Sequence, residues 1–201
     1  MALSKIDVAN MVTGATPVAN GGTGLTSGTS GQFLKFTGST TLASNAVSEG
    51  ITVSSQWRLT SSFTNDASPI ASNWEEVDTA YSRIGSTMTE SSGVFTFPST
   101  GIYLIHFQTW FNHAVGETEA NLIIDYTANN GSSWAGLSRT SAGEGNDGGY
   151  SGGATMGFFD VTNTSNYKVR FVVAVANTGT QCLGDSGYTA TGVTFVRIGD
   201  T

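Results

Sequence analysis

The most constraining feature of this sequence is a series of segments rich in aromatic and β-branched residues between residues 51 and 201. The composition of these segments is typical of β-strands. The longer ones cover residues 101–111, 121–127, 167–175 and 192–198, and the shorter ones cover 57–59, 94–97 and 155–161. Turn-forming residues separate them, as in 98–101 and 129–131. Helical periodicity is suggested only in residues 73–81. The pattern predicts an all-β sandwich or barrel.

Two of the predicted strands are apolar on both faces. In residues 101–111, Ile102, Leu104 and Trp110 lie on one face of the predicted strand, and other aromatic and aliphatic side chains lie on its other face. In the strand predicted over residues 167–175, Val172 lies on the face opposite to that of its apolar neighbours. A strand that is apolar on both faces is normally covered on both. Because no helix is predicted to cover the second face, we expect these four residues to contact other copies of the chain. A strand buried between two sheets is the alternative.

The first 50 residues differ in composition from the rest. They contain no Trp or Tyr, although the chain has four Trp and six Tyr, and their only aromatic residues are Phe33 and Phe36. Such a segment cannot bury enough apolar area to offset the entropy of ordering it. We therefore expect residues 1–50 to be disordered or ordered by other chains. Residues 51–201 are long enough for one ordinary core.

Composition also excludes several classes of protein. The chain has 8 basic and 15 acidic side chains and a net charge of −7, which argues against nucleic-acid binding. It has no apolar run long enough to cross a bilayer, and its first ten residues do not resemble a secretion signal. The single cysteine, Cys182, allows neither an internal disulfide nor a cysteine metal cluster.

Residues 57–199 contain motifs of a known family. Phe95 is followed after five residues by Gly101, Ile102 and Tyr103, and then by further apolar residues up to Phe107. This pattern resembles the core motif of C1q-like domains, and residues 161–171 and 192–198 are similar to later strands of that family. The resemblance implies a ten-stranded jelly-roll sandwich, shared with tumour-necrosis-factor ligands, that forms homotrimers through one sheet of each protomer.

The N-terminal part has a resemblance of its own. Residues 16–27 and 31–38 are similar to segments of bacteriophage tail-fibre and related appendage proteins. Their most distinctive part is the run Asn20, Gly21, Gly22, Thr23 and Gly24. Glycines permit close approach of backbones, which three chains around one axis require. The resemblance implies that residues 1–50 form a virion attachment segment and an extended, Gly/Thr/Ser-rich trimeric neck; a flexible linker is the alternative.

Residue patterns of enzymes are weak in this chain. His106 and His113 do not have the spacing of metal ligands, and nucleophile-elbow and phosphate-loop motifs are absent. Cys182 is interpreted as a small buried apolar residue. Glu75 and Glu117 are the carboxylates that a glycan-degrading enzyme would use, but solvated acidic turns are the favoured interpretation. We predict no catalytic residues and no required cofactor.

The glycine-rich residues 143–153 are predicted to form a loop. Glu144, Asn146 and Asp147 offer oxygen ligands of the kind that Ca²⁺ prefers, although a solvated loop is the favoured interpretation. Binding residues concentrate on loops held by a rigid scaffold. Trp134, Tyr150 and Tyr188 are therefore candidate receptor contacts, with ordinary core packing as the alternative.

Together these patterns favour a homotrimeric phage fibre on the virion surface. Residues 1–50 would contact other virion proteins, and the head, residues 51–201, would adhere to a glycan or protein of the host cell surface. A purely architectural capsid fibre, decoration or tail connector is the second hypothesis, and a glycan-degrading appendage is the third. Neither nucleic-acid binding nor membrane insertion is expected.

Overall fold

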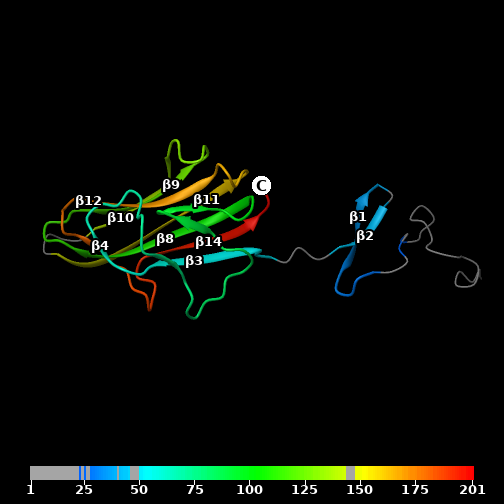
Figure 1. Cartoon of the computed structure of the whole chain (residues 1–201), viewed down its shortest axis with the longest axis horizontal. Helices are drawn as coiled ribbons and strands as arrows, with labels where there is room; N and C mark the ends of the chain where they lie inside the picture. The colour runs from blue at the N-terminus through cyan, green and yellow to red at the C-terminus, as the bar shows by residue number, and fades with distance from the viewer. Residues whose placement is uncertain (1–22, 24, 26–27, 40, 46–49, 144–147) are drawn as a thin grey trace, which may run out of the picture. The chain divides into compact units, whose positions relative to one another are not determined.

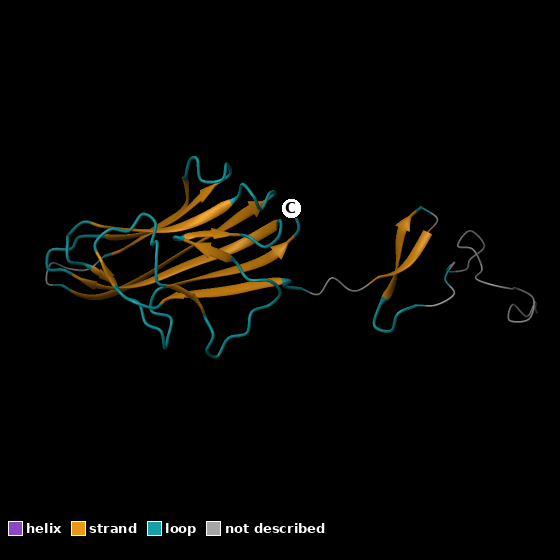
Figure 2. Cartoon of the chain, in the orientation of Figure 1, coloured by secondary structure: helices purple, strands orange, loops and turns teal. Residues whose placement is uncertain are grey.

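The computed structural model describes Thr23, Leu25 and residues 28–39, 41–45, 50–143 and 148–201. The chain divides into two compact units, Met1–Glu49 and Gly50–Thr201. The described residues contain strands, turns and loops but no helix, as Figure 2 shows. The all-β class expected from the sequence is therefore confirmed.

One sheet of the second unit has five antiparallel strands in the order β10-β9-β12-β7-β6. Its strands are β6 (Thr89–Ser91), β7 (Val94–Thr96), β9 (Ala120–Thr127), β10 (Ala135–Ala142) and β12 (Lys168–Val175). Strand β10 is an edge strand, and its pairing with β9 is interrupted by a bulge between Gly136 and Ser138. A bulge bends the strand locally and redirects its side chains.

The other sheet has seven strands, with β8 (Gly101–His113) at its centre. One side of β8 pairs with all thirteen residues of β11 (Gly149–Val161). The other side pairs with β14 (Gly192–Gly199) and with the short β13 (Gln181–Cys182). The sheet is completed by β3 (Val53–Leu59), β4 (Phe63–Thr64) and β5 (Trp74–Glu76).

The two sheets lie face to face, and Figure 1 shows β8 and β14 in one layer and β9 and β12 in the other. Many aromatic side chains form the core between them. Phe95 of β7 is central to it: its ring centroid lies 5.4 Å from those of Phe171 and Phe195. Trp57 and Trp74 approach the same ring edge-on at 5.5 Å. Aromatic pairs at this separation add about 0.5–1.5 kcal/mol each beyond the area they bury.

The first unit contains a hairpin of β1 (Phe33–Gly38) and β2 (Thr41–Asn45). The sequence analysis did not predict these strands. Phe33, Leu34 and Phe36 are all exposed, Phe36 by 63%. A lone two-stranded hairpin is marginally stable in water. The exposure of these three side chains shows that they bury little apolar area within the described residues.

Two expectations about local structure are wrong. Residues 73–81 contain the short strand β5 and no helix, because Trp74 turns into the core and donates a 2.8 Å hydrogen bond to the carbonyl of Ile70. The expected loop 143–153 ends earlier than predicted, because β11 begins at Gly149. Pairing with β8 along its whole length overrides the low strand propensity of its glycines.

Candidate functional site

The side chains of β8 alternate between core and surface. Tyr103, Ile105 and Phe107 are completely buried between the sheets. Ile102 and Leu104 point the other way and are half-buried, and Trp110 on the same side is exposed. The outward side of β8 is therefore not covered by the second sheet. Central burial between two sheets, the alternative left open by the sequence, does not apply to this strand.

Neighbouring strands extend this outward apolar surface. Phe158 of β11 lies directly opposite Leu104 in the strand register, and Val196 of β14 lies opposite Leu104 on the other side. Met156 occupies the next outward position of β11, beside His106. Phe158 and Met156 are 64% and 60% exposed. We call this surface the apolar face; it consists of Ile102, Leu104, Trp110, Met156, Phe158 and Val196. Contiguous exposed apolar surface on a soluble domain marks an interaction site.

Glycines bring β11 close to the core. A Cβ atom added at Gly153 would lie 3.0 Å from a methyl carbon of Leu122 and 3.2 Å from the Cβ of Ala142. One added at Gly157 would lie 3.0 Å from Leu137. These two inward positions are filled from the opposite sheet, whereas the inward Phe159 packs its own ring into the core. Glycine at positions 153 and 157 is thus a packing requirement of a strand.

Val172 does not belong with the other three predicted interface residues. It lies on β12 of the five-stranded sheet, in register with Ile123, and is only 6% exposed. Its outward face is already covered within the protomer. Val172 therefore lies on a different sheet from Ile102, Leu104 and Trp110, and its low exposure leaves little of it for contact with another copy.

The three candidate receptor aromatics do not form one site. Tyr150 is an outward residue of β11, and its ring centroid lies 5.8 Å from that of Trp110, at the end of the apolar face. Tyr188 is exposed in the loop before β14, next to Thr189, whose carbonyl accepts a hydrogen bond from Gln108 of β8. Trp134 lies instead against Arg170, an outward residue of the five-stranded sheet.

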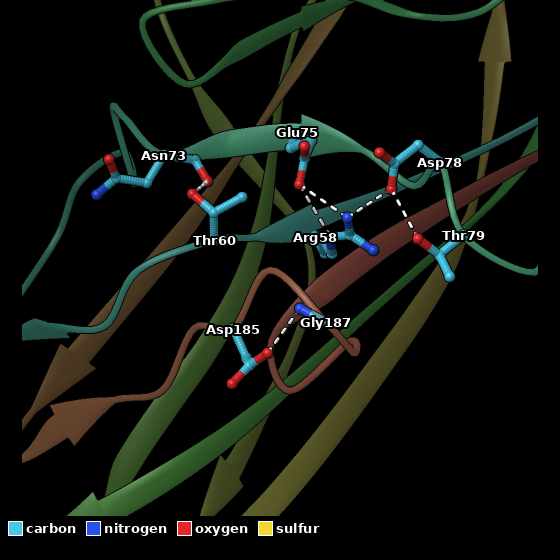
Figure 3. Close-up of polar contacts among 8 residues, drawn as sticks. All are labelled: Arg58, Thr60, Asn73, Glu75, Asp78, Thr79, Asp185 and Gly187. Atoms are coloured by element: carbon cyan, nitrogen blue, oxygen red, sulfur yellow. Dashed lines mark hydrogen bonds and ion pairs between the residues drawn. The ribbon is translucent and has the colours of Figure 1, made fainter.

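Glu75 is part of an ion-pair cluster around Arg58, shown in Figure 3. The Arg58 side chain is 3% exposed, and its Nη2 lies 3.0 Å from Glu75 Oε2 and 2.6 Å from Asp78 Oδ1. The hydrogen bond from Arg58, together with one from Thr79, holds the pKa of Asp78 below its ordinary value. Both carboxylates thus neutralise a buried guanidinium. This arrangement favours a structural role for Glu75 over an acid–base role.

Glu117 is also held by hydrogen bonds, although it is 1% exposed. Its carboxylate accepts hydrogen bonds from the Thr180 hydroxyl at 2.5 Å and from the backbone amides of Glu119, Ala176 and Asn177 at 3.0–3.2 Å. Burial acts to raise the pKa of Glu117, but these hydrogen bonds stabilise the charged form and bring the pKa below its ordinary value. The side chain joins two loops, and its oxygens are occupied within the protein.

The histidines and the cysteine form no catalytic set in the part of the chain that the structure describes. His113 Nε2 lies 2.5 Å from Ser151 Oγ, which is the geometry of a base and a nucleophile. However, His113 Nδ1 is buried without a hydrogen-bond partner, so no carboxylate orients the ring as a triad requires. His106 lies outward between Met156 and Thr194. Cys182 is buried, and burial raises the pKa of its thiol to about 12.

Several predicted residues lie outside the described residues. These are the Ca²⁺ candidates Glu144, Asn146 and Asp147 and the neck residues Asn20, Gly21, Gly22 and Gly24. Thr23 is described, and its hydroxyl accepts a 3.4 Å hydrogen bond from the Leu25 amide. Within the described ranges, no group of three or more His, Cys, Asp or Glu side chains is placed to hold a metal ion. Those ranges also contain no helix long and apolar enough to span a membrane.

Comparisons with known proteins identify the fold. The structure of murine APRIL at pH 5.0 matches with a TM-score of 0.56 at 14% identity, over 73% of this chain and 98% of that one. Eiger TNF from S. frugiperda matches with a TM-score of 0.54 at 10% identity, over 76% and 96%. The fold is a TNF-like jelly roll. At these identities the likeness concerns the fold alone. No protein-family model and no curated protein matches the sequence.

Sequence reasoning missed the contribution of β11 to the apolar face. Met156 and Phe158 alternate with the inward Thr155, Gly157 and Phe159. This two-residue period was the signal that could have found them. A strand was predicted over residues 155–161, but its pairing with β8, which brings Met156 and Phe158 beside His106 and Leu104, was not predicted.

Proposed function

We propose that this protein is a homotrimeric phage fibre whose jelly-roll head is assembled through the apolar face. The observation that carries the proposal is the exposure of Phe158 and Met156 beside Leu104 on the outward side of the seven-stranded sheet. Burying such side chains removes apolar area from water at roughly 25 cal/mol per Å². Among the described residues, β8 is the one strand that pairs with β11, so β11 is an edge strand of its sheet, and edge strands favour association.

The number of copies and the virion location come from the sequence resemblances. The resemblance of residues 57–199 to C1q-like domains implies three protomers, and the resemblance of residues 16–38 to tail-fibre segments implies a phage appendage. The exposed Phe33, Leu34 and Phe36 of the β1–β2 hairpin support an ordered neck over a flexible linker, since contact between copies would cover them. Residues 1–50 would then attach the fibre to other virion proteins.

Adhesion to the host cell surface is the role proposed for the head. Three heads present the same weak site three times, and simultaneous engagement raises the overall affinity without any new contact. A trimer would carry three times the chain's −7, about −21, which favours solubility and repels anionic surfaces at long range. Receptor contacts must therefore come from local features of the head. An architectural fibre or connector would need none.

The assembly is tested by light scattering on the purified chain. We expect a particle of three 20.8-kDa chains, about 62 kDa. Phe158→Glu places a charge in the apolar face and is expected to shift this mass towards the monomer. Val115→Glu is the control, because Val115 is 72% exposed in the loop after β8 and is not one of the residues of the apolar face. A stable wild-type monomer at micromolar concentration would overturn the trimer.

The role is tested by binding of the purified trimer to host cells and to a glycan array. Binding supports adhesion, and its absence at concentrations where avidity operates favours the architectural alternative. Turnover of host polysaccharide that is lost on Glu75→Gln or Glu117→Gln, in variants shown to remain folded, would instead support the enzymatic alternative. We expect no such turnover, because the carboxylates of Glu75 and Glu117 already accept hydrogen bonds from Arg58 and Thr180.

A further inference from the structure

Arg139 of β10 is held in place by a buried neutral side chain. Its Nε and Nη2 donate hydrogen bonds of 3.1 and 2.8 Å to Oδ1 of Asn121, which is only 5% exposed. A guanidinium has five N–H donors, so these two bonds leave three for a ligand. Because Asn121 carries no charge, it orients the guanidinium without neutralising it.

The positive charge of Arg139 is uncompensated in the part of the chain that the structure describes. The other four arginines, Arg58, Arg83, Arg170 and Arg197, each form an ion pair with a carboxylate at or below 3.0 Å. Arg139 is exposed and has no carboxylate within ion-pair distance among the described residues. In an acidic protein this is a distinctive arrangement, and a planar guanidinium fork matches the geometry of a carboxylate.

A hollow of about 400 Å³ adjoins Arg139 along the edge strand β10 of the five-stranded sheet. It is lined by Ile123, Gly136, Leu137, Ser138 and Arg139. Gly136 lies across from the outward residue Asp125, and a Cβ atom added to it would have no heavy atom within 4 Å. The missing side chain therefore leaves open space. The volume falls in the usual range for small-ligand sites, about 300–1,000 Å³.

Beside the hollow, Arg170 contacts both Asp125 and Trp134. Arg170 donates a 3.0 Å hydrogen bond to Asp125, and its guanidinium lies 4.5 Å from the centre of the Trp134 ring. Asp125 is thereby neutralised by Arg170 and does not oppose an anion at Arg139. Trp134, predicted from the sequence as a receptor contact, lies just before β10 and thus near Gly136.

We propose that this hollow binds a carboxylated sugar, with the carboxylate on the free donors of Arg139 and one apolar ring face over Ile123. An acidic sugar matches the two features of the hollow, because its carboxylate pairs with the guanidinium of Arg139 and its ring face covers the small apolar surface. Arg139 and Ile123 are outward residues of the five-stranded sheet, so self-association through the apolar face of the other sheet leaves them accessible. At physiological ionic strength charges are screened beyond about 8 Å, so Arg139 acts locally despite the acidic chain.

The inference rests on the adhesion part of the proposed function and names the receptor chemistry. It is tested by titrating the full-length protein with trigalacturonate, its methyl ester and inorganic phosphate, using calorimetry and Trp fluorescence. We expect one trigalacturonate per protomer and at least about tenfold weaker binding of the neutral ester. Phosphate is expected to bind far more weakly, because it lacks the apolar ring face.

Two kinds of variant test the contribution of the Arg139 charge and that of the open space at Gly136 to binding separately. Arg139→Gln and Gly136→Leu are each expected to weaken trigalacturonate binding at least about tenfold. Arg83→Gln, which removes an exposed guanidinium elsewhere, and Gly136→Ala, which leaves most of the hollow open, should bind nearly as the wild type does. Circular dichroism and light scattering verify that each variant remains folded and assembled.

The outcomes distinguish this site from adhesion in general. Equal binding of ester and acid, equal binding of phosphate, or unchanged binding by Arg139→Gln would overturn the site. Cell adhesion that survives Arg139→Gln would overturn this site as the receptor contact and leave adhesion standing. Binding of soluble trigalacturonate without cell adhesion would support the site and contradict the adhesive role.

Discussion

The carboxylate of Glu117 accepts a 2.5 Å hydrogen bond from the hydroxyl of Thr180, 63 residues later in the chain. Thr180 also accepts a hydrogen bond from the amide of Ala114, so the two side chains join the loop after β8 to the loop after β12. Glu117 is nearly fully buried and ionised, and its hydrogen bonds replace the water that it loses. The pair is therefore a structural link between loops at one end of the sandwich.

Replacing Glu117 by Gln is expected to destabilise the head. The amide group of Gln presents a donor where the carboxylate accepts, so at least one buried backbone amide loses its partner. We expect a loss of roughly 2–3 kcal/mol in the free energy of unfolding. Urea denaturation followed by Trp fluorescence measures it. Glu119→Gln is the matched control, because Glu119 is exposed, and it should change stability by less than about 0.5 kcal/mol.

The stability difference between wild type and Glu117→Gln is expected to depend on pH. The folded-state pKa of Glu117 lies below its ordinary value of 4.5. The ionised side chain therefore contributes fully to the free energy of unfolding above about pH 4.5. This stabilisation is lost as the pH falls through the folded-state pKa of Glu117. Thermal unfolding from pH 7 down to acid pH should show the two curves converging. If the stability difference between wild type and Glu117→Gln stays constant over this pH range, the pKa of Glu117 is not lowered in the folded protein.

Gly153→Ala is expected to destabilise the head by about 1–3 kcal/mol. The new methyl group would meet side chains of Leu122 and Ala142 at 3.0–3.2 Å, in a strand that cannot move away without losing its pairing with β8. Chemical denaturation measures the change. Gly199→Ala provides the comparison, because no atom lies within 4 Å of the added Cβ, and it should be nearly neutral. Equal effects would contradict tight packing at Gly153.

Cys182 is expected to be unreactive in the folded protein. Its thiol is 1% exposed, and burial raises its pKa to about 12, so the reactive thiolate is scarce at neutral pH. Labelling with a chromogenic disulfide reagent should proceed only through unfolding. Its rate in water should therefore lie far below the rate in denaturant, and a fast native reaction would show that the thiol is accessible.

The sequence alone was sufficient for the fold class and for the strands in residues 101–113, 120–127, 168–175 and 192–199. Their β-branched and aromatic residues follow local rules that need no knowledge of distant neighbours. The same rules placed Ile102, Leu104 and Trp110 on the second side of a strand. They predicted β11 only in part, over residues 155–161, and its inward Gly153 and Gly157 are covered by Leu122, Ala142 and Leu137 of other strands.

Only the tertiary structure decided which residues share a surface. Val172 and Ile102 have similar sequence patterns, yet they lie on different sheets, and register determines the partners of each. The contact between Arg139 and Asn121 arises because β9 and β10 pair as neighbours around a bulge, which no local pattern encodes. Periodicity along a chain determines which side of a strand is apolar. The pairing of strands determines what that side meets, because it depends on residues that are distant in sequence.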